Sequence, residues 1–309
     1  MSDLKVHLLR EGIVESVHTC EAVVTDHRGR VLSRSPGESL PTFMRSALKP
    51  FQALAVLSTG AAQAFQFGDA DLALMCASHS GEMVHARRAF SMLWRLNLEP
   101  ANLVCPIPPG KESPLQHNCS GKHVGMLAAC LQRGFPVEHY AERRHPVQQL
   151  VAETLAELLA MPADEFVVAR DDCGVPTYQF TLAQMAWLYA QLSAGRNPGL
   201  ERLMRAMIRE PRMVAGEGRF DTELMRLSEG AVVSKTGAEG VHCVGFVGQG
   251  LGLAVKVLDG GHRAKAPLVI HLLRELGWID PSVADVLNDR FAALNPHQRL
   301  EVVGELEMV

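Results

Sequence analysis

The stretch Met44-Arg45-Ser46-Ala47-Leu48-Lys49-Pro50 organises the interpretation of this chain, because it places a hydroxyl and an amine three residues apart. If a helix begins at Ser46, residues three apart lie on one face, so the Lys49 amine can remove the hydroxyl proton. A serine hydroxyl is a poor nucleophile until such a base is within hydrogen-bond reach. Taken alone, the pair is more often part of a solvated helix surface, so its surroundings must decide.

Strand-like sequence lies at both ends of the chain, and helical spacing lies between them. Strands are predicted at 5–9, 16–25, 30–33, 231–234, 241–247 and 251–257. Helices are predicted at 46–59, 71–77, 85–96, 122–132, 146–159, 182–193, 200–209 and 264–276, and loops at 78–82, 105–122 and 170–178. Residues 301–309 are compatible with either an edge strand or a frayed tail.

This order predicts an α+β fold, in which an antiparallel sheet is built from both chain ends and a helical subdomain is inserted. We expect residues 1–45 and 213–309 to form the sheet subdomain. Residues 46–212 are expected to form the mostly helical one. The nucleophile helix would then open the helical subdomain.

Composition excludes several classes of function. The formal net charge is -4 and no Lys/Arg block forms a basic stripe, which argues against a nucleic-acid partner. No run of about 18 apolar residues is present, and the N-terminus is charged where a signal peptide would be apolar. The seven cysteines form no short-spaced framework, which favours reduced thiols. We therefore expect a cytoplasmic protein without a membrane partner.

A second cluster, Ser78-His79-Ser80-Gly81-Glu82, joins two hydroxyls and an imidazole before a predicted helix. One interpretation is a capping box with Ser78 as the cap. The other makes Ser78 a second catalytic hydroxyl close to Ser46.

A third cluster contains Cys119 within residues 116–123, and Cys173 lies far downstream within residues 170–176. Two thiolates and a neighbouring imidazole would suit zinc. Neither segment has a Cys-x-x-Cys spacing, however, so buried and inert cysteines remain the alternative.

A fourth cluster, Val233-Ser234-Lys235-Thr236-Gly237, ends a predicted strand. A Lys-Thr-Gly edge strand accompanies Ser-x-x-Lys in penicillin-recognising serine enzymes, where it faces the nucleophile. The two motifs occur here in the expected order, with a helical insertion between them.

Several longer strings together resemble the Rhizobium-type L-asparaginase II family, from about residue 10 to residue 280. They are the stretch 44–50, Cys76–Glu82, His117–His123, Asp172–Pro176, Gly216–Thr222, Lys235–Gly240, and Lys256–Gly260 with Arg263-Ala264. The resemblance implies a serine-β-lactamase-like fold and hydrolysis of the side-chain amide of L-asparagine to L-aspartate and ammonia. It also suggests a homodimer.

The resemblance further implies roles for individual residues. Ser46 would be the nucleophile, Lys49 its base and Ser78 a second catalytic hydroxyl, while Lys235 would transfer a proton or neutralise charge. A zinc ion would be held by Cys119, Lys122 and Cys173. The residues expected near the substrate are Arg45, His123, Asp171, Gly237, Ala238 and Glu239.

Alternative functions remain open from the sequence. The same site could prefer glutamine, or it could cleave a β-lactam or peptide amide. A non-catalytic protein that binds zinc or an amino acid on a retired hydrolase scaffold is the rival outside enzymes.

Overall fold

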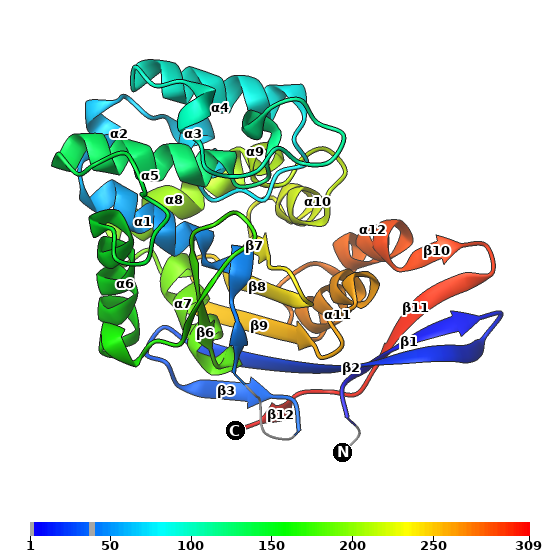
Figure 1. The fold of residues 1–309 in the computed structure, drawn as a ribbon. Coiled ribbons are helices and arrows are strands. Elements are labelled where there is room, and N and C mark those ends of the chain that lie inside the picture. The colour runs from blue at the N-terminus through cyan, green and yellow to red at the C-terminus, as the bar shows by residue number, and fades with distance from the viewer. Residues whose placement is uncertain (1–2, 37–40) are drawn as a thin grey trace. The chain divides into compact units, whose positions relative to one another are not determined.

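The computed structural model describes residues 3–36 and 41–309, and the chain forms two compact units (Figure 1). The sheet unit contains Met1–Ala47, Phe180–Arg196 and Glu223–Val309. The helical unit contains Leu48–Gln179 and Asn197–Thr222. No helix in these described ranges is long and apolar enough to cross a bilayer.

The sheet unit is built on antiparallel strands from both ends of the chain. Its main path runs β10-β11-β1-β2-β9-β8-β7, and β3 pairs with β2 and with β12. The strands are β1 (Lys5–Arg10), β2 (Ile13–Asp26), β3 (Val31–Arg34), β7 (Val232–Thr236), β8 (Val241–Phe246), β9 (Leu251–Val257), β10 (Ala293–Asn295), β11 (Gln298–Val303) and β12 (Glu307–Met308). The two-residue strand β4 (Thr42–Phe43) precedes the nucleophile stretch. The predicted α+β fold, with a sheet built from both chain ends, is confirmed.

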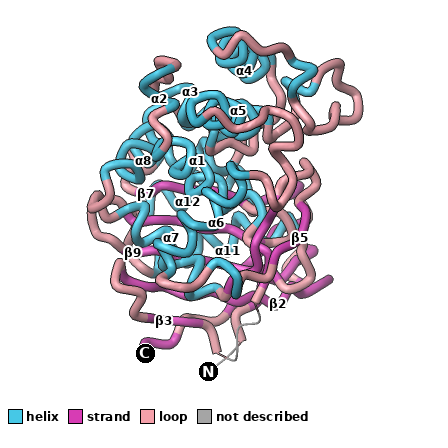
Figure 2. Tube along the Cα trace, turned by 60° about the vertical axis from the view of Figure 1, so that its left-hand side comes forward, coloured by secondary structure: helices cyan, strands magenta, loops and turns pink. Residues whose placement is uncertain are grey.

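Helix α7 (Leu182–Ser193) belongs to the sheet unit, where it packs on β9 and β2 (Figure 2). Two glycines paired across β8 and β9, Gly245 and Gly252, let the helix approach closely. A Cβ atom at Gly252 would lie 2.0 Å from the Ala186 carbonyl oxygen, and one at Gly245 would lie 2.7 Å from the Tyr189 carbonyl oxygen. The division predicted from sequence assigns residues 182–193 to the helical subdomain instead. Its sequence is apolar on nearly every side, which is typical of a helix covered by a sheet.

The last part of the chain holds more structure than the sequence pattern predicted. Helix α11 (His262–Glu275) was expected, but α12 (Pro281–Phe291) was not. Its N-terminal signal is present, because the Asp280 side chain accepts a hydrogen bond from the Ser282 N–H and Pro281 opens the helix. Residues 301–309 resolve into the end of β11, which pairs with β1, and into β12.

The helical unit packs α1 (Lys49–Ser58), α3 (Asp69–Met75), α5 (Ser120–Arg133) and α8 (Pro198–Arg209) against one another (Figure 2). A Cβ atom at Gly121 would lie 2.2 Å from the Leu74 carbonyl oxygen, so this glycine permits the approach of α5 to α3. The remaining helices are α2 (Ala61–Ala64), α4 (Met83–Arg95), α6 (Pro146–Leu159) and α9 (Pro211–Val214), with short 3-10 turns η2 (Pro100–Asn102), η3 (Pro114–Gln116) and η4 (Ala163–Glu165). Helix α10 (Phe220–Leu227) runs across the division between the units.

The predicted loop at 170–178 is largely a hairpin instead. Strands β5 (Val168–Arg170) and β6 (Pro176–Phe180) pair antiparallel, and only residues 171–175 form the turn. The turn closes through the Asp171 N–H, which donates to the Val175 carbonyl oxygen at 2.8 Å. Gly174 adopts φ +94°, a left-handed value that favours glycine.

Candidate functional site

The nucleophile stretch forms a 3-10 turn, η1 (Arg45–Leu48), which leads directly into α1. Helix α1 therefore begins at Lys49 and not at Ser46, because Arg45 has φ +52° and the following residues form the tighter turn. Residues three apart in a 3-10 turn lie on the same face. The local backbone thus keeps Ser46 and Lys49 on the same face of the turn, as the motif predicts.

Within the sheet unit, two contacts hold the turn that carries Ser46. The buried Tyr189 hydroxyl donates to the Ala47 carbonyl oxygen at 2.8 Å. Gly237, just beyond β7, lies so close that a Cβ atom there would be 3.0 Å from the Met44 carbonyl oxygen. The Lys-Thr-Gly segment and the Ser46 turn are therefore neighbours, as the motif order predicted. Nothing in the sequence pointed to Tyr189, which lies far from the motif along the chain.

Two buried lysines lie at the end of β7. The Lys235 side chain is fully buried, and its Nζ donates to the Thr236 carbonyl oxygen at 2.8 Å. Lys265, from α11, donates through Nζ to the Gly237 carbonyl oxygen at 2.8 Å. Lys265 is not among the predicted site residues, although a lysine among apolar residues of an amphipathic helix is a usable signal.

The turn after β7 carries the last two predicted substrate residues, Ala238 and Glu239. Glu239 is exposed and has φ +53°, and the Lys256 ammonium donates to its carbonyl oxygen. A Cβ atom at Gly260 would lie 2.7 Å from Glu239 Oε2, so this carboxylate packs on the neighbouring loop. The backbone of this turn is fixed, and the carboxylate is directed toward Gly260.

Within the helical unit, Lys49 is fully buried and contacts three oxygen atoms. Its Nζ lies 2.5 Å from the Ala77 carbonyl oxygen, 3.3 Å from the Asn118 carbonyl oxygen and 3.0 Å from Ser78 Oγ. The structure therefore brings together two of the predicted catalytic residues, Lys49 and Ser78, from positions 29 residues apart in the chain.

The loop that carries Ser78 is fixed on both sides. The N–H groups of Ser78 and Ser80 donate to the carbonyl oxygens of Val214 and Ala215, each at 2.8 Å. His79 is buried, and its Nε2 lies 2.9 Å from Ser120 Oγ. Burial, reinforced by nearby His85 and Lys49, holds the pKa of His79 well below its usual range, so its imidazole is neutral.

The alternative interpretation of Ser78 as a helix cap is wrong. Helix α4 begins at Met83, and Glu82 occupies its N-cap position. Ser78 lies four residues earlier, and its hydroxyl is directed to the Lys49 amine.

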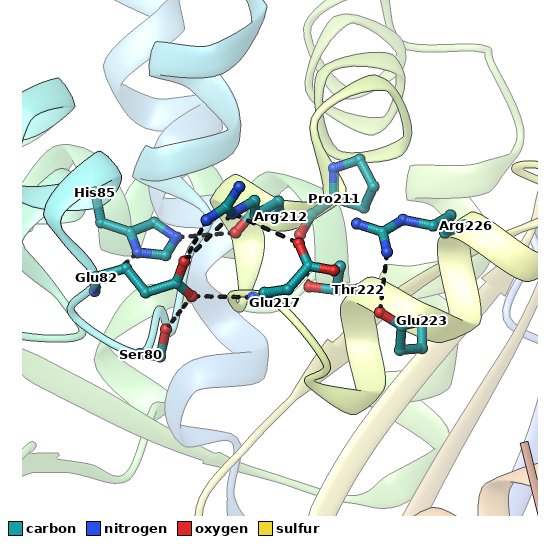
Figure 3. Close-up of polar contacts among 9 residues, drawn as sticks. All are labelled: Ser80, Glu82, His85, Pro211, Arg212, Glu217, Thr222, Glu223 and Arg226. Atoms are coloured by element: carbon teal, nitrogen blue, oxygen red, sulfur yellow. Dashed lines mark hydrogen bonds and ion pairs between the residues drawn. The ribbon is translucent and has the colours of Figure 1, made fainter. Parts of the chain in front are cut away.

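Glu82 closes the same loop through an ion-pair network (Figure 3). Its Oε2 pairs with Arg212 at 2.8 Å, and its Oε1 accepts from Ser80 Oγ at 2.7 Å and from the Glu217 N–H at 2.9 Å. The hydrogen bond from Arg212 is the largest influence that lowers the Glu82 pKa, to about 2. The segment 216–222, one of the strings that carry the family resemblance, thus helps to position the loop that carries Ser78.

The predicted metal ligands Cys119, Lys122 and Cys173 also meet in the helical unit, and all three are buried. Lys122 Nζ lies 3.0 Å from Cys173 Sγ. Cys119 and His123 lie beside the same sulfur; together with the Lys122 charge they lower the pKa of Cys173, despite burial. Asp171 is close enough for its charge to act on Lys122.

Tyr140 is a further residue that the sequence did not reveal. Its hydroxyl lies 2.7 Å from His123 Nδ1, so it orients the imidazole. The other ring nitrogen, Nε2, is buried without a regular hydrogen bond among the described residues and lies on the side of Cys173.

These residues fit a zinc ion only if Lys122 is a ligand. Among the described residues, no group of three or more His, Cys, Asp and Glu side chains is arranged to hold a metal. The predicted ligands are the thiols of Cys119 and Cys173 and the amine of Lys122. Two soft sulfur donors and a nitrogen that already lies 3.0 Å from one of them are compatible with zinc chemistry.

Comparison with known proteins identifies the family. The model of the L-asparaginase II family matches residues 6–308. The chain belongs to the L-asparaginase II family. The matched residues cover nearly the whole chain, which agrees with the family resemblance of the sequence motifs.

Solved structures add a fold-level comparison for this L-asparaginase II family member. Mglu in its native form is 12% identical, with a TM-score of 0.51 over 85% of this chain and 65% of that chain. Mglu crystallised in 4.3 M NaCl is 13% identical, with a TM-score of 0.49 over 84% and 61% of the two chains. The chain thus spans less than two thirds of the length of Mglu. The match with a TM-score of 0.51 shows a shared fold alone.

A beta-lactamase from Mycobacterium bovis is 13% identical, with a TM-score of 0.35 over 88% of this chain and 95% of that chain. This TM-score is too low to support an argument. A search of curated proteins found no match.

Proposed function

We propose that this amidohydrolase is an L-asparaginase that works through a serine acyl-enzyme. The observation that carries the proposal is the buried Lys49 amine, 3.0 Å from Ser78 Oγ and three residues after Ser46 in a continuous helical turn. An amine in its neutral form has two N–H donors and one lone pair. In the structure Lys49 Nζ donates to the carbonyl oxygens of Ala77 and Asn118 and to Ser78 Oγ. In the proposed neutral form, the two N–H groups would stay with the carbonyl oxygens, and the lone pair would be available for a hydroxyl proton.

In the proposed reaction, Ser46 Oγ forms a bond to the side-chain carbonyl carbon of asparagine while Lys49 takes the hydroxyl proton. The C–N bond then breaks, and the proton passes to the leaving amine, which departs as ammonia. Water attacks the ester, and aspartate leaves as Ser46 regains its proton. Ser78 relays protons to and from Lys49, and the fixed backbone of residues 237–239 orients the substrate.

The decisive experiment compares Ser46→Ala with Ser78→Ala in an ammonia-release assay with asparagine and, separately, with glutamine. We expect Ser46→Ala to lose at least about 10³-fold in kcat with asparagine, because the nucleophile is gone. Ser78→Ala should lose less, and a mass increment from trapped substrate should map to the peptide that contains Ser46.

The outcomes separate the rivals. An increment on the Ser78 peptide would make Ser78 the nucleophile and overturn the assigned roles. Faster release of ammonia from glutamine than from asparagine would identify a glutaminase. Turnover of a chromogenic β-lactam would identify a β-lactam hydrolase. Ligand-induced stabilisation without turnover of any of these substrates would favour the binding protein.

We also propose that Cys119, Lys122 and Cys173 hold one zinc ion. A bound zinc would supply a positive charge that orients the polar groups of the substrate. Metal analysis of the purified protein should find about one zinc per chain, and Cys173→Ser should lose it. The matched control is Cys130→Ser, since Cys130 is a buried cysteine of α5 outside this cluster. Wild-type protein purified with zinc in the buffer but without bound metal would contradict the assignment.

A further inference from the structure

A small pocket in the helical unit lies beside the turn between β5 and β6. Its volume is about 170 Å³. Ala141, Val168 and Pro176 contribute apolar wall, and Gly174 contributes backbone. Arg143 and Arg170 are the charged residues of its lining. The pocket therefore combines two guanidinium groups with an otherwise uncharged surface.

The two arginines have no acidic partner among the described residues, although ion pairs are frequent elsewhere on this surface. Arg143 is near enough to β6 for its charge to act on the Tyr178 hydroxyl. Two like charges that line one pocket repel each other. An anion placed between them would relieve that repulsion.

The size of the pocket limits the ligand. A volume of about 170 Å³ holds roughly five or six water molecules, since each occupies about 30 Å³ in the liquid. A nucleotide would not fit, whereas one phosphate or one short dicarboxylate would. Guanidinium groups present paired N–H donors that match the oxygen atoms of both anions.

We propose that this pocket is a binding site for a small dianion, held between Arg143 and Arg170. The proposal is independent of the asparaginase activity, because neither arginine belongs to the catalytic set. The ligand would be either an inorganic oxyanion such as phosphate or a dicarboxylate of about four carbons.

The position of the pocket gives such binding a consequence. Arg170 ends β5 and pairs with Pro176 of β6, and the turn between them carries Asp171 and Cys173. Gly174 belongs both to this turn and to the lining of the pocket. A bound dianion would thus hold the turn that presents Asp171 and Cys173, and would slow its opening.

The test is calorimetric titration of the full chain with potassium phosphate and, separately, with succinate at constant ionic strength. We expect at least one of them to bind with a Kd on the order of 1 mM or tighter. Arg143→Ala and Arg170→Ala should each weaken that binding about tenfold or more. Arg144→Ala is the matched control, since this exposed neighbour of Arg143 does not line the pocket and should leave the Kd unchanged.

Two further measurements make the result specific. Binding of phosphate alone would identify an oxyanion site, whereas binding of succinate would identify a carboxylate site. Amide hydrogen exchange at residues 171–175 should slow when the ligand is added to the wild type and stay unchanged in Arg170→Ala. Failure of both anions to bind, or binding that survives both substitutions, would overturn the proposal. Both arginines are exposed, so the variants are expected to fold, and thermal melting verifies this.

Discussion

Replacing Lys49 by methionine is expected to lower kcat for ammonia release by about 10²–10⁴-fold, the usual contribution of a positioned general base. Methionine has a similar length and fills the buried site, but it has no lone pair for a hydroxyl proton. It also leaves the carbonyl oxygens of Ala77 and Asn118 without the Lys49 donor. The measurement is steady-state kinetics with asparagine, together with a thermal melt of each variant.

Two control variants distinguish the role of Lys49 as a base from the effects of its charge and of its packing. Lys49→Arg keeps a buried cation with donors but cannot give up its proton, so it should be as inactive as the methionine variant. Gln52→Met changes another buried polar residue of α1, one turn away, and should retain activity. A Lys49→Met enzyme whose kcat stayed within about tenfold of the wild type would remove Lys49 from the base role.

The largest expected effect on stability follows from Gly252→Ala. Its methyl group would lie 2.0 Å from the Ala186 carbonyl oxygen, and backbone atoms of a packed helix cannot move aside as a flexible side chain can. Either α7 must lift from β9 or the strand must bend. We expect a loss of about 3 kcal/mol in the free energy of unfolding, measured by urea titration.

Gly68→Ala is the matched control for this substitution. No atom lies within 4 Å of a Cβ at Gly68, and its φ is -92°, which any residue can adopt. Its unfolding midpoint should stay close to that of the wild type. A Gly252→Ala variant that is equally stable would show that α7 and β9 are not packed as closely as described.

Much of the fold could be predicted from sequence because its elements have strong local patterns. Strand β9 and helix α8 carry the two- and three-to-four-residue spacings that the sequence displays, and both occur near their predicted positions. The assignment of α7 to a unit could not be read from local spacing. It depends on the glycines Gly245 and Gly252, whose role appears only when β8 and β9 pair.

The candidate site also has features that the sequence motifs predict and features that they do not. The order of the motifs predicted that the Lys-Thr-Gly segment lies near the Ser46 turn, and Gly237 does lie beside the Met44 carbonyl oxygen. The contact between Lys49 and Ser78 was not determined by spacing, because it depends on how the loop at 78–80 is tied to Val214 and Ala215. Supporting residues such as Tyr140 had no motif, since a buried partner of an imidazole leaves no pattern in the sequence.

The sheet that joins both chain ends also constrains the order in which this protein can be made. Strand β1 lies between β2, its neighbour in sequence, and β11, which is synthesised almost 300 residues later. Until the ribosome has released β11, β1 must remain an open edge, and the pairing of β2 with β9 is similarly delayed. The helices at 48–179 depend mainly on contacts that already exist by then. During translation the helical unit therefore has time to form its contacts before the sheet is complete.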